Sequence, residues 1–217
     1  MNKALKIVLI IVLVLVLLIG GGFAWLYSNG MSGMSSTTEA AEGQIRIACV
    51  GDSITYGHGT TGWPANSYPS KLQGLLGDAY HVNNYGVSGH AVQANADMPY
   101  RDLPHYQESI AYDADIVVFM MGSNDAKPQN WIDAATFKAD LLSLLEVYGE
   151  TNHHIQPLVV NEIAEIVREV AQEHGYTLID IHALTAEHPE WFSGDGVHPS
   201  NDGAAAIAQT IASVLTE

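Results

Sequence analysis

The sequence contains a single cysteine and few positive charges. Cys49 has no partner for an intramolecular disulfide or a cysteine metal cluster, and its apolar neighbours in 45–50 predict a buried side chain. Eight lysines and arginines stand against 24 aspartates and glutamates, which gives a formal net charge of −16. Because an acidic surface repels phosphate backbones, this balance argues against nucleic acid as a partner and disfavours anionic lipid surfaces.

Acidic residues are also absent from the N-terminal part, where the longest apolar run occurs. Leu5–Tyr27 is apolar apart from Lys6 and, at about 1.5 Å per residue, can cross a ~30 Å hydrocarbon layer. Lys3 and Lys6 suit the cytoplasmic side, and the run is longer than a usual secretory h-region. Residues 1–27 therefore predict an uncleaved signal-anchor helix, with the membrane contacted only through this helix and the rest of the chain extracellular. Cleavage near Ala40-Ala41 is the alternative.

The remaining chain divides into a linker and one domain. Residues 28–43 are rich in Ser, Thr, Gly and Met and lack periodicity, which predicts a flexible tether. Residues 44–217, roughly 175 in number, suit a single domain that can bury a core without disulfide or metal staples.

Within this domain, short apolar runs alternate with segments of helical periodicity. The expected strands are Ile45–Val50, His81–Tyr85, Asp115–Met121 and Thr177–Ile181. The expected helices are one from Ser67 to near Gly77, Ala134–Tyr148, Pro157–His174 and Asp202–Leu215. The alternation of apolar strands with helices predicts a parallel sheet covered by helices on both faces. Any active site is then expected beyond the carboxyl ends of the strands.

Four loop segments carry residues suited to chemistry. Ser53, just past the first strand, presents a hydroxyl at the sheet edge, and Gly89 and Asn124 follow later strands with donors for an oxyanion. Before the last helix, His198 can serve as a base that Asp195, three residues upstream, orients. Each segment taken alone also fits a turn, a helix cap, a loop hydrogen bond or half of a metal site.

Together the four segments resemble the motif blocks of the SGNH hydrolases, also called GDSL esterases. Gly51-Asp52-Ser53 matches the first block, with Ile54 where a leucine often stands, and Gly89, Asn124 and the Asp195–His198 segment match the later blocks. The resemblance runs from about Ile45 to the C-terminus and implies an α/β fold, a flavodoxin-like three-layer α/β/α sandwich.

The resemblance also implies a role for each matched residue. Ser53 would be the nucleophile, His198 the general base and Asp195 the residue that orients it. The oxyanion hole would consist of the Ser53 and Gly89 N–H groups and the Asn124 amide. No metal or organic cofactor is implied.

One stretch departs from the family pattern. Family members carry a further strand between the helix after the asparagine block and the next helix, but residues 148–156 contain no apolar run. Leu158–Val160 could be that strand, but its helical phase favours a helix. We therefore expect a sheet one strand short of the family norm, with Thr177–Ile181 displaced by about one strand spacing, ~4.8 Å. Because catalytic geometry tolerates an error of about 1 Å, this departure puts activity in question.

Several other residues have both a functional and a plain interpretation. The His153-His154 pair could bind a metal or simply lie on a loop. Three further histidines could line the mouth of the site or be solvated. Two tryptophans could stack on a sugar ring or pack against other side chains. These residues are His58, His90 and His105, and Trp63 and Trp131. Met120-Met121 is expected in the sheet core.

The function expected from the resemblance is carboxylic ester hydrolysis through an acyl-serine. By analogy, we expect an extracellular carbohydrate O-deacetylase or esterase whose partner is a small-molecule or carbohydrate ester. A lysophospholipase or thioesterase is the enzymatic alternative. An inactive surface binding protein on the same fold is the alternative outside enzymes, and the apparent loss of a strand favours it.

Overall fold

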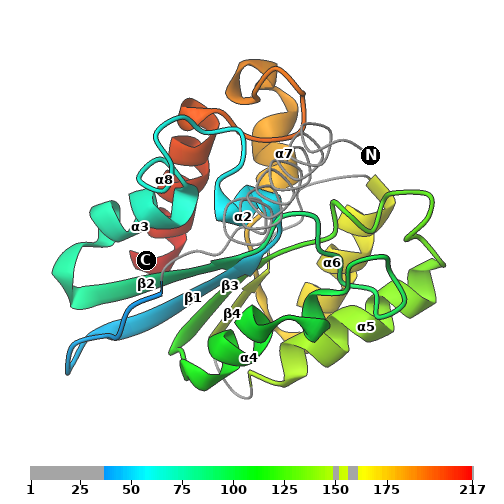
Figure 1. Ribbon diagram of the computed structural model, residues 1–217, viewed down its shortest axis with the longest axis horizontal. Coiled ribbons are helices and arrows are strands. Elements are labelled where there is room, and N and C mark those ends of the chain that lie inside the picture. The colour runs from blue at the N-terminus through cyan, green and yellow to red at the C-terminus, as the bar shows by residue number, and fades with distance from the viewer. Residues whose placement is uncertain (1–36, 149–151, 156–160, 217) are drawn as a thin grey trace, which may run out of the picture.

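The computed structural model describes residues 37–148, 152–155 and 161–216. In these ranges the chain forms a parallel five-stranded sheet with the order β2-β1-β3-β4-β5 (Figure 1). The strands are β1 (Ile45–Gly51), β2 (Tyr80–Gly86), β3 (Ile116–Met120), β4 (Asn152–Ile155) and β5 (Thr177–Leu178). This order is that of the flavodoxin-like doubly wound sheet, so the predicted α/β class is confirmed.

Helices cover both faces of this sheet, as Figure 1 shows. One face carries α4 (Pro104–Ala111), α5 (Ala134–Glu146) and α6 (Asn161–His174). The other carries α3 (Tyr68–Leu76) and α8 (Asn201–Thr216), with the short α7 (Ile181–Ala186) beside them. A four-residue helix, α2 (Ser53–Tyr56), follows β1, and 3₁₀ turns occupy Gly77–Ala79, Tyr100–Asp102 and Pro189–Trp191.

The alternation of side chains along the central strands builds two separate cores. In β1, Ala48 and Val50 join the core under α4–α6, whereas Ile47 and Cys49 join the core under α3 and α8. Successive strand residues point to opposite faces, so apolar residues at every position fill both cores. The predicted burial of Cys49 and of Met120-Met121 is confirmed.

The prediction of a missing strand is wrong. Residues 152–155 form β4, which pairs in parallel with β3 on one side and with β5 on the other. Only one of the four residues in Asn-His-His-Ile is aliphatic, so a search for apolar runs misses this strand. Its place in the sheet depends on backbone pairing to β3, which tertiary context decides rather than local composition. With β4 present, β5 takes the fifth position without the expected displacement.

The last strand also differs from its predicted range. The structure has β5 over Thr177–Leu178, and the helix α7 already begins at Ile181. The reason is a cap, because the Asp180 carboxylate accepts a hydrogen bond from the Ala183 N–H at 2.8 Å. The predicted helix over 157–174 is described from Asn161 onward, and residues 156–160 lie outside the described residues.

Close backbone packing brings α2 down onto the carboxyl ends of β1 and β2. Gly51 and Gly86 are register partners at these ends. A Cβ on Gly51 would lie 2.0 Å from the Thr55 Oγ1, and one on Gly86 would lie 2.2 Å from the Tyr56 N. Only glycine allows this approach, which sets Ser53 directly on the sheet edge.

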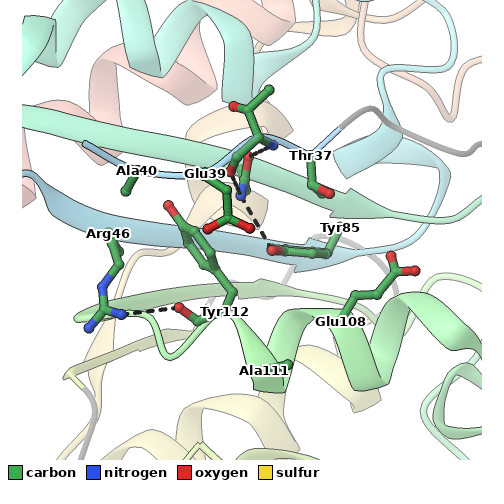
Figure 2. Close-up of a pocket in the computed structure, with 10 residues that line it drawn as sticks. Thr37, Glu39, Ala40, Arg46, Tyr85, Glu108, Ala111 and Tyr112 are labelled. Carbon is green, nitrogen blue, oxygen red and sulfur yellow. Dashed lines mark hydrogen bonds between the residues drawn. The ribbon is translucent and has the colours of Figure 1, made fainter. Parts of the chain in front are cut away.

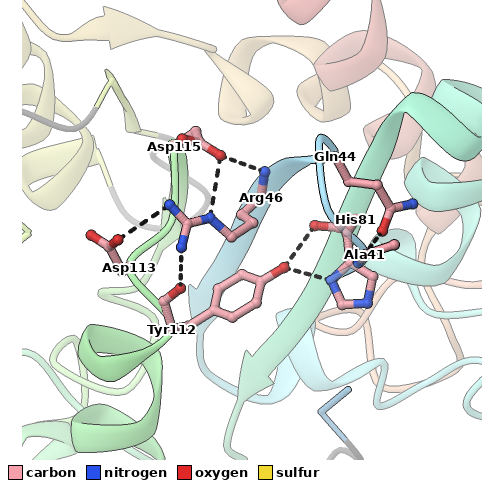
Figure 3. A network of polar contacts seen from close by, with 7 residues as sticks. All are labelled: Ala41, Gln44, Arg46, His81, Tyr112, Asp113 and Asp115. Atoms are coloured by element: carbon pink, nitrogen blue, oxygen red, sulfur yellow. Dashed lines mark hydrogen bonds and ion pairs between the residues drawn. The ribbon is translucent and has the colours of Figure 1, made fainter. Parts of the chain in front are cut away.

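At the opposite, amino edge of the sheet, charged groups are bonded to one another (Figure 3). The Arg46 guanidinium forms ion pairs with Asp113 at 3.2 Å and Asp115 at 3.4 Å, and it donates to the Tyr112 carbonyl. The Tyr112 hydroxyl donates to the His81 carbonyl at 3.0 Å and also contacts the His81 ring. This network ties the start of β1 to β2 and to the turn before β3.

The N-terminal segment before β1 lies against this domain as far as it is described. Thr38, within the predicted tether, donates its N–H to Asn83 at 3.1 Å and contacts His81 at 2.9 Å through its hydroxyl. The predicted anchor, residues 1–27, lies outside the described residues. Among the helices that the structure describes, none has the length and hydropathy needed to cross a bilayer.

Candidate active site

The serine of the first loop meets the histidine of the last loop at the carboxyl edge of the sheet. Ser53 Oγ lies 2.8 Å from His198 Nε2, although the two residues are 145 positions apart in the chain. His198 Nδ1 lies 2.6 Å from Asp195 Oδ2. The three side chains therefore form a continuous hydrogen-bonded row in the order serine, imidazole, carboxylate. A row of this kind can move a proton from the hydroxyl to the imidazole.

The loop before α8 holds Asp195 firmly. One oxygen of Asp195 accepts three hydrogen bonds, from the N–H groups of His198 and Val197 at 2.9 Å each and from the Ser193 hydroxyl at 2.8 Å. Together with the imidazole on the other oxygen, these donors hold the pKa of Asp195 well below its usual range, with the His198 N–H as the largest cause. Asp195 thus stays ionised at neutral pH and holds the His198 ring through Nδ1.

The loop that follows α2 packs on the loop that carries His198, and so connects the segment of Ser53 with the segment of His198. Gly59 has a φ of +88°, and a Cβ there would lie 2.7 Å from the Cβ of His198. Further along this loop, Thr61 and Asn201 exchange two hydrogen bonds of 2.9 Å, which fix it to the start of α8. The segment after the serine therefore holds the histidine in place.

A third loop, after β3, supplies an oriented side-chain amide. Asn124 Nδ2 donates to the His90 carbonyl at 2.9 Å, and its other N–H makes a long contact of 3.4 Å with Asp52 Oδ2. The long contact is beyond the usual 2.7–3.2 Å range, so this second N–H is the one that can turn to an oxyanion. The second loop brings Gly89, at a φ of +87°, to the same cavity.

Sequence reasoning missed two buried carboxylates that position these loops. Asp52 is fully buried, accepts the Ile54 N–H at 3.0 Å, and has its pKa raised to about 6 by burial. Asp125 accepts the N–H groups of Val92 and Gln93 at 2.9 and 2.8 Å, which fastens the second loop to the third. Both residues adjoin matched motif positions, but a sequence does not reveal that a loop carboxylate is buried.

The four loops surround a cavity of about 450 Å³. Its lining among the described residues is Ser53, His58, Ser88, Gly89, Ser123, Asn124, Lys127, Val197 and His198. Val197 is the one aliphatic side chain in this set, and no carboxylate belongs to it. The cavity thus offers hydrogen-bond donors, but only one aliphatic side chain for an apolar group.

A second cavity, of about 490 Å³, lies between α4, β2 and the segment before β1 (Figure 2). Thr38, Arg46, Tyr85, Glu108 and Tyr112 are among its lining residues. It is slightly larger, and the hydroxyl of its lining residue Thr38 lies 2.9 Å from His81 Nε2, but the other ring nitrogen of His81 contacts the Tyr112 hydroxyl and not a carboxylate. The chemistry that the sequence predicts therefore belongs to the smaller cavity.

The structure separates the histidines that the sequence left open. His58 lies at the site, with its ring centroid 4.4 Å from that of His198, whereas His90 and His105 are buried and lie outside the cavity lining. His153-His154 lies in β4, and its side chains are outside the described set. Trp63 stacks on Tyr56, and Trp131 packs near Phe137.

One cluster among the described residues has the donor types of a metal site. Ligand atoms of His58, Asp195 and His198 lie within 4.8 Å of one another. Both nitrogens of His198 already contact Ser53 and Asp195. A metal held there would displace one of these contacts, so the donor set suits proton transfer better than ligation.

Comparison with known proteins gives this arrangement a context. Residues 49–206 match the model of the GDSL-like Lipase/Acylhydrolase family. A curated relative, an acetylxylan esterase of Xylanibacter ruminicola, is 30% identical over an alignment covering 84% of this chain and 45% of the relative. The chain thus spans less than half the length of the curated relative that it matches.

Solved structures share the fold at lower identity. A lipase/acylhydrolase from Enterococcus faecalis superposes with a TM-score of 0.65 at 22% identity, covering 78% of this chain and 94% of that one. A carbohydrate acetylesterase family member from Sinorhizobium meliloti superposes with a TM-score of 0.59 at 21% identity, covering 78% and 96%. At these identities the likeness establishes the three-layer α/β fold.

Proposed function

The chain belongs to the GDSL-like lipase/acylhydrolase family, and from that premise we propose that it is a serine esterase that removes acetyl groups from carbohydrate. The observation that carries the proposal is the 2.8 Å contact between Ser53 Oγ and His198 Nε2 beside a cavity with oxyanion donors. This contact answers the doubt raised by the apparent strand deletion, and it weakens the alternative of an inactive binding protein.

The proposed reaction proceeds through an acyl-serine. His198 Nε2 takes the proton of Ser53 Oγ as this oxygen bonds to the ester carbonyl carbon, and Asp195 stabilises the resulting imidazolium. The carbonyl oxygen becomes an oxyanion that accepts hydrogen bonds from the N–H groups of Ser53 and Gly89 and from the Asn124 amide. The carbon–oxygen bond to the alcohol then breaks, and His198 gives its proton to the leaving oxygen.

Water completes the cycle by the same groups. His198 removes a proton from a water molecule as that molecule attacks the acyl-serine. The tetrahedral intermediate collapses, the free acid leaves, and Ser53 regains its proton from His198. Every proton taken up by the imidazole is returned, so the reaction needs no co-reactant besides water.

The nature of the cavity supports a short acyl group and a polar alcohol. Its volume of about 450 Å³ and its single aliphatic lining residue, Val197, leave little surface for a fatty acyl chain. A lysophospholipase or long-chain thioesterase would bury a long apolar chain and so needs such a surface. The acetylxylan esterase name of the curated relative supports carbohydrate as the alcohol.

The test is the release of acetate from acetylated xylo-oligosaccharides by wild type and Ser53→Ala. We expect hydrolysis that falls by about 10⁴-fold or more in the variant, with an unchanged melting temperature. Hydrolysis of 4-nitrophenyl butyrate and 4-nitrophenyl palmitate measures the acyl preference. Equal acetate release by both proteins would refute the esterase proposal, and a preference for palmitate would refute its short-acyl part.

We also propose that the enzyme is attached to the membrane and faces the cell exterior. This part rests on sequence alone, namely the apolar run Leu5–Tyr27 after Lys3 and Lys6. Protease added to intact cells should remove the domain, and carbonate washing of membranes should retain it. Recovery of the full-length chain in the soluble fraction would contradict the attachment.

A further inference from the structure

The charged residues that line the catalytic cavity differ in sign from the majority of the chain. The chain carries 24 acidic and eight basic residues, yet no aspartate or glutamate lines the cavity among the described residues, and one lysine does. Ser53, Gly89 and Asn124 add neutral hydrogen-bond donors to the same walls. The wall of the cavity therefore carries one positive charge and no carboxylate, and the ionised Asp195 contacts His198 from outside this wall.

The lysine in this wall, Lys127, differs from the other described cations in its lack of a partner. The cations with carboxylate partners are Arg46, Arg101, Lys138 and Arg168, and Lys71 donates to the Asn66 amide oxygen. Lys127, by contrast, forms no ion pair or side-chain hydrogen bond with any residue that the structure describes. Its ammonium group is thus available to an external anion.

The turn that carries Asn124 also fixes the backbone of Lys127. The Lys127 N–H donates to the Asn124 carbonyl at 3.3 Å, and the Lys127 carbonyl accepts the N–H groups of Asn130 and Trp131 at 2.9 and 3.0 Å. Lys127 therefore starts one turn beyond the oxyanion donor, on a rigid segment. The fixed backbone sets where the Lys127 side chain starts, and ordering that side chain on binding still costs part of the attraction.

From this placement we infer that Lys127 selects esters carrying an anionic group, such as a carboxylate, close to the ester bond. The inference rests on the proposed function and refines its substrate class, from acetylated carbohydrate to acetylated carbohydrate that carries acid groups. The exposed Asp97 competes for the Lys127 charge, because the pKa of Asp97 is lowered chiefly by Asn130 and in part by Lys127. A substrate carboxylate inside the cavity would be less screened by water than Asp97.

The test compares matched charged and neutral esters in wild type and Lys127→Gln. In one pair the charge is on the alcohol part, 3-acetoxybenzoate against 3-acetoxybenzamide. In the other it is on the acyl part, the 4-nitrophenyl hemiester of succinic acid against 4-nitrophenyl butyrate. We expect the charged-to-neutral ratio of kcat/KM to fall about fivefold to tenfold in the alcohol pair. A fall in the acyl pair alone would contradict the inferred acetylated substrate.

Two further variants separate a charge effect from a structural one. Lys127→Arg should keep most of the wild-type ratio. Lys138→Gln, on helix α5, where the lysine pairs with Glu169 and Glu173, should leave the ratio and the kcat/KM of both esters unchanged. Raising the ionic strength should lower the ratio in wild type but not in Lys127→Gln. Ratios equal in wild type and Lys127→Gln for both pairs would overturn the inference while the esterase stands. Absence of Ser53-dependent hydrolysis of all four esters would overturn both.

Discussion

The two edges of the sheet use polar groups in different ways. At the amino edge, Arg46, Asp113, Asp115 and Tyr112 bond to one another (Figure 3). At the carboxyl edge, Ser53, His198 and Asp195 are bonded into a row, but among the described residues the N–H groups of Ser53 and Gly89 have no acceptor.

The difference separates a structural polar network from a reactive one. Mutually satisfied groups lower the free energy of the folded state and have nothing left to offer a ligand. N–H groups that have no acceptor and lie beside the hydrogen-bonded serine hydroxyl can donate to negative charge that develops during a reaction. Changes at the carboxyl edge should therefore alter rate, and changes at the amino edge should alter stability alone.

The largest expected effect in this comparison comes from the oxyanion donor of the third loop. Asn124→Ala removes the side-chain amide, and kcat should fall about 10²–10³-fold while KM changes little, because the lost bond is stronger in the transition state. Steady-state kinetics with a short 4-nitrophenyl ester measures this. An effect confined to KM would mean that Asn124 binds substrate rather than the oxyanion.

The next effect concerns the loop that packs on the histidine. Gly59→Ala places a methyl group within 2.7 Å of the His198 Cβ at a φ of +88°, so the imidazole should shift and kcat/KM should fall by roughly 10²-fold. Gly74→Ala is the matched control. Gly74 lies in α3 with no atom within 4 Å of an added Cβ, so its variant should be fully active and slightly more stable. Equal activities in the two variants would contradict the role of Gly59.

A third effect concerns the buried carboxylate beneath the site and should appear in stability. Burial raises the folded-state pKa of Asp52 to about 6, whereas an unfolded aspartate titrates near 4. Between pH 4 and 6 the folded chain keeps a proton that the unfolded chain has lost, so this contribution to stability is complete below pH 4 and is lost by pH 6. Two pKa units correspond to roughly 3 kcal/mol as an upper value.

Urea denaturation of wild type and Asp52→Asn at pH 4, 5, 6 and 7 measures this effect. The stability of the variant relative to wild type should rise with pH over this range. Asp133 gives a control, because its bond to the Thr136 N–H lowers its pKa, so the stability it contributes is present over this whole series and is lost only below about pH 4. A flat difference for Asp52→Asn would mean that Asp52 is not buried as described.

The smallest effect belongs to the amino edge. Arg46→Gln breaks two ion pairs whose arginine side chain is one-third exposed, so we expect a loss of about 0.5–1 kcal/mol in unfolding free energy. The value of kcat/KM, measured where both proteins are fully folded, should be unchanged. A loss of activity comparable with that of Asn124→Ala would erase the distinction between the two edges.

Much of this architecture could be predicted because local patterns agree with the tertiary fold. The apolar strands β1 and β3, and the helix α5 with Phe137, Leu141, Leu144 and Leu145 buried along one face, follow from periodicity. Ser53, Gly89 and Asn124 could be proposed as neighbours because residues at the ends of parallel strands converge. Asp195 and His198 could be added because their segment resembles the last motif block of the family.

The rest depended on contacts between distant segments. Residues 152–155 are mostly polar, and their pairing to β3 makes them a strand. Asp52 and Asp125 are ordinary turn residues in sequence, and their importance comes from burial against loops far along the chain. Lys127 likewise gains meaning only from the cavity that it lines and from having no ion-pair partner within residues 37–148, 152–155 and 161–216.

The central claim, that His198 activates Ser53, can be tested by labelling with a fluorophosphonate, whose phosphorus bonds to an activated serine oxygen as fluoride leaves. Mass spectrometry of peptides from wild type and His198→Gln locates and times the adduct. We predict one adduct, on Ser53, that forms at least about 10³-fold more slowly in the variant. Labelling elsewhere, or at a rate that does not depend on His198, would contradict the account.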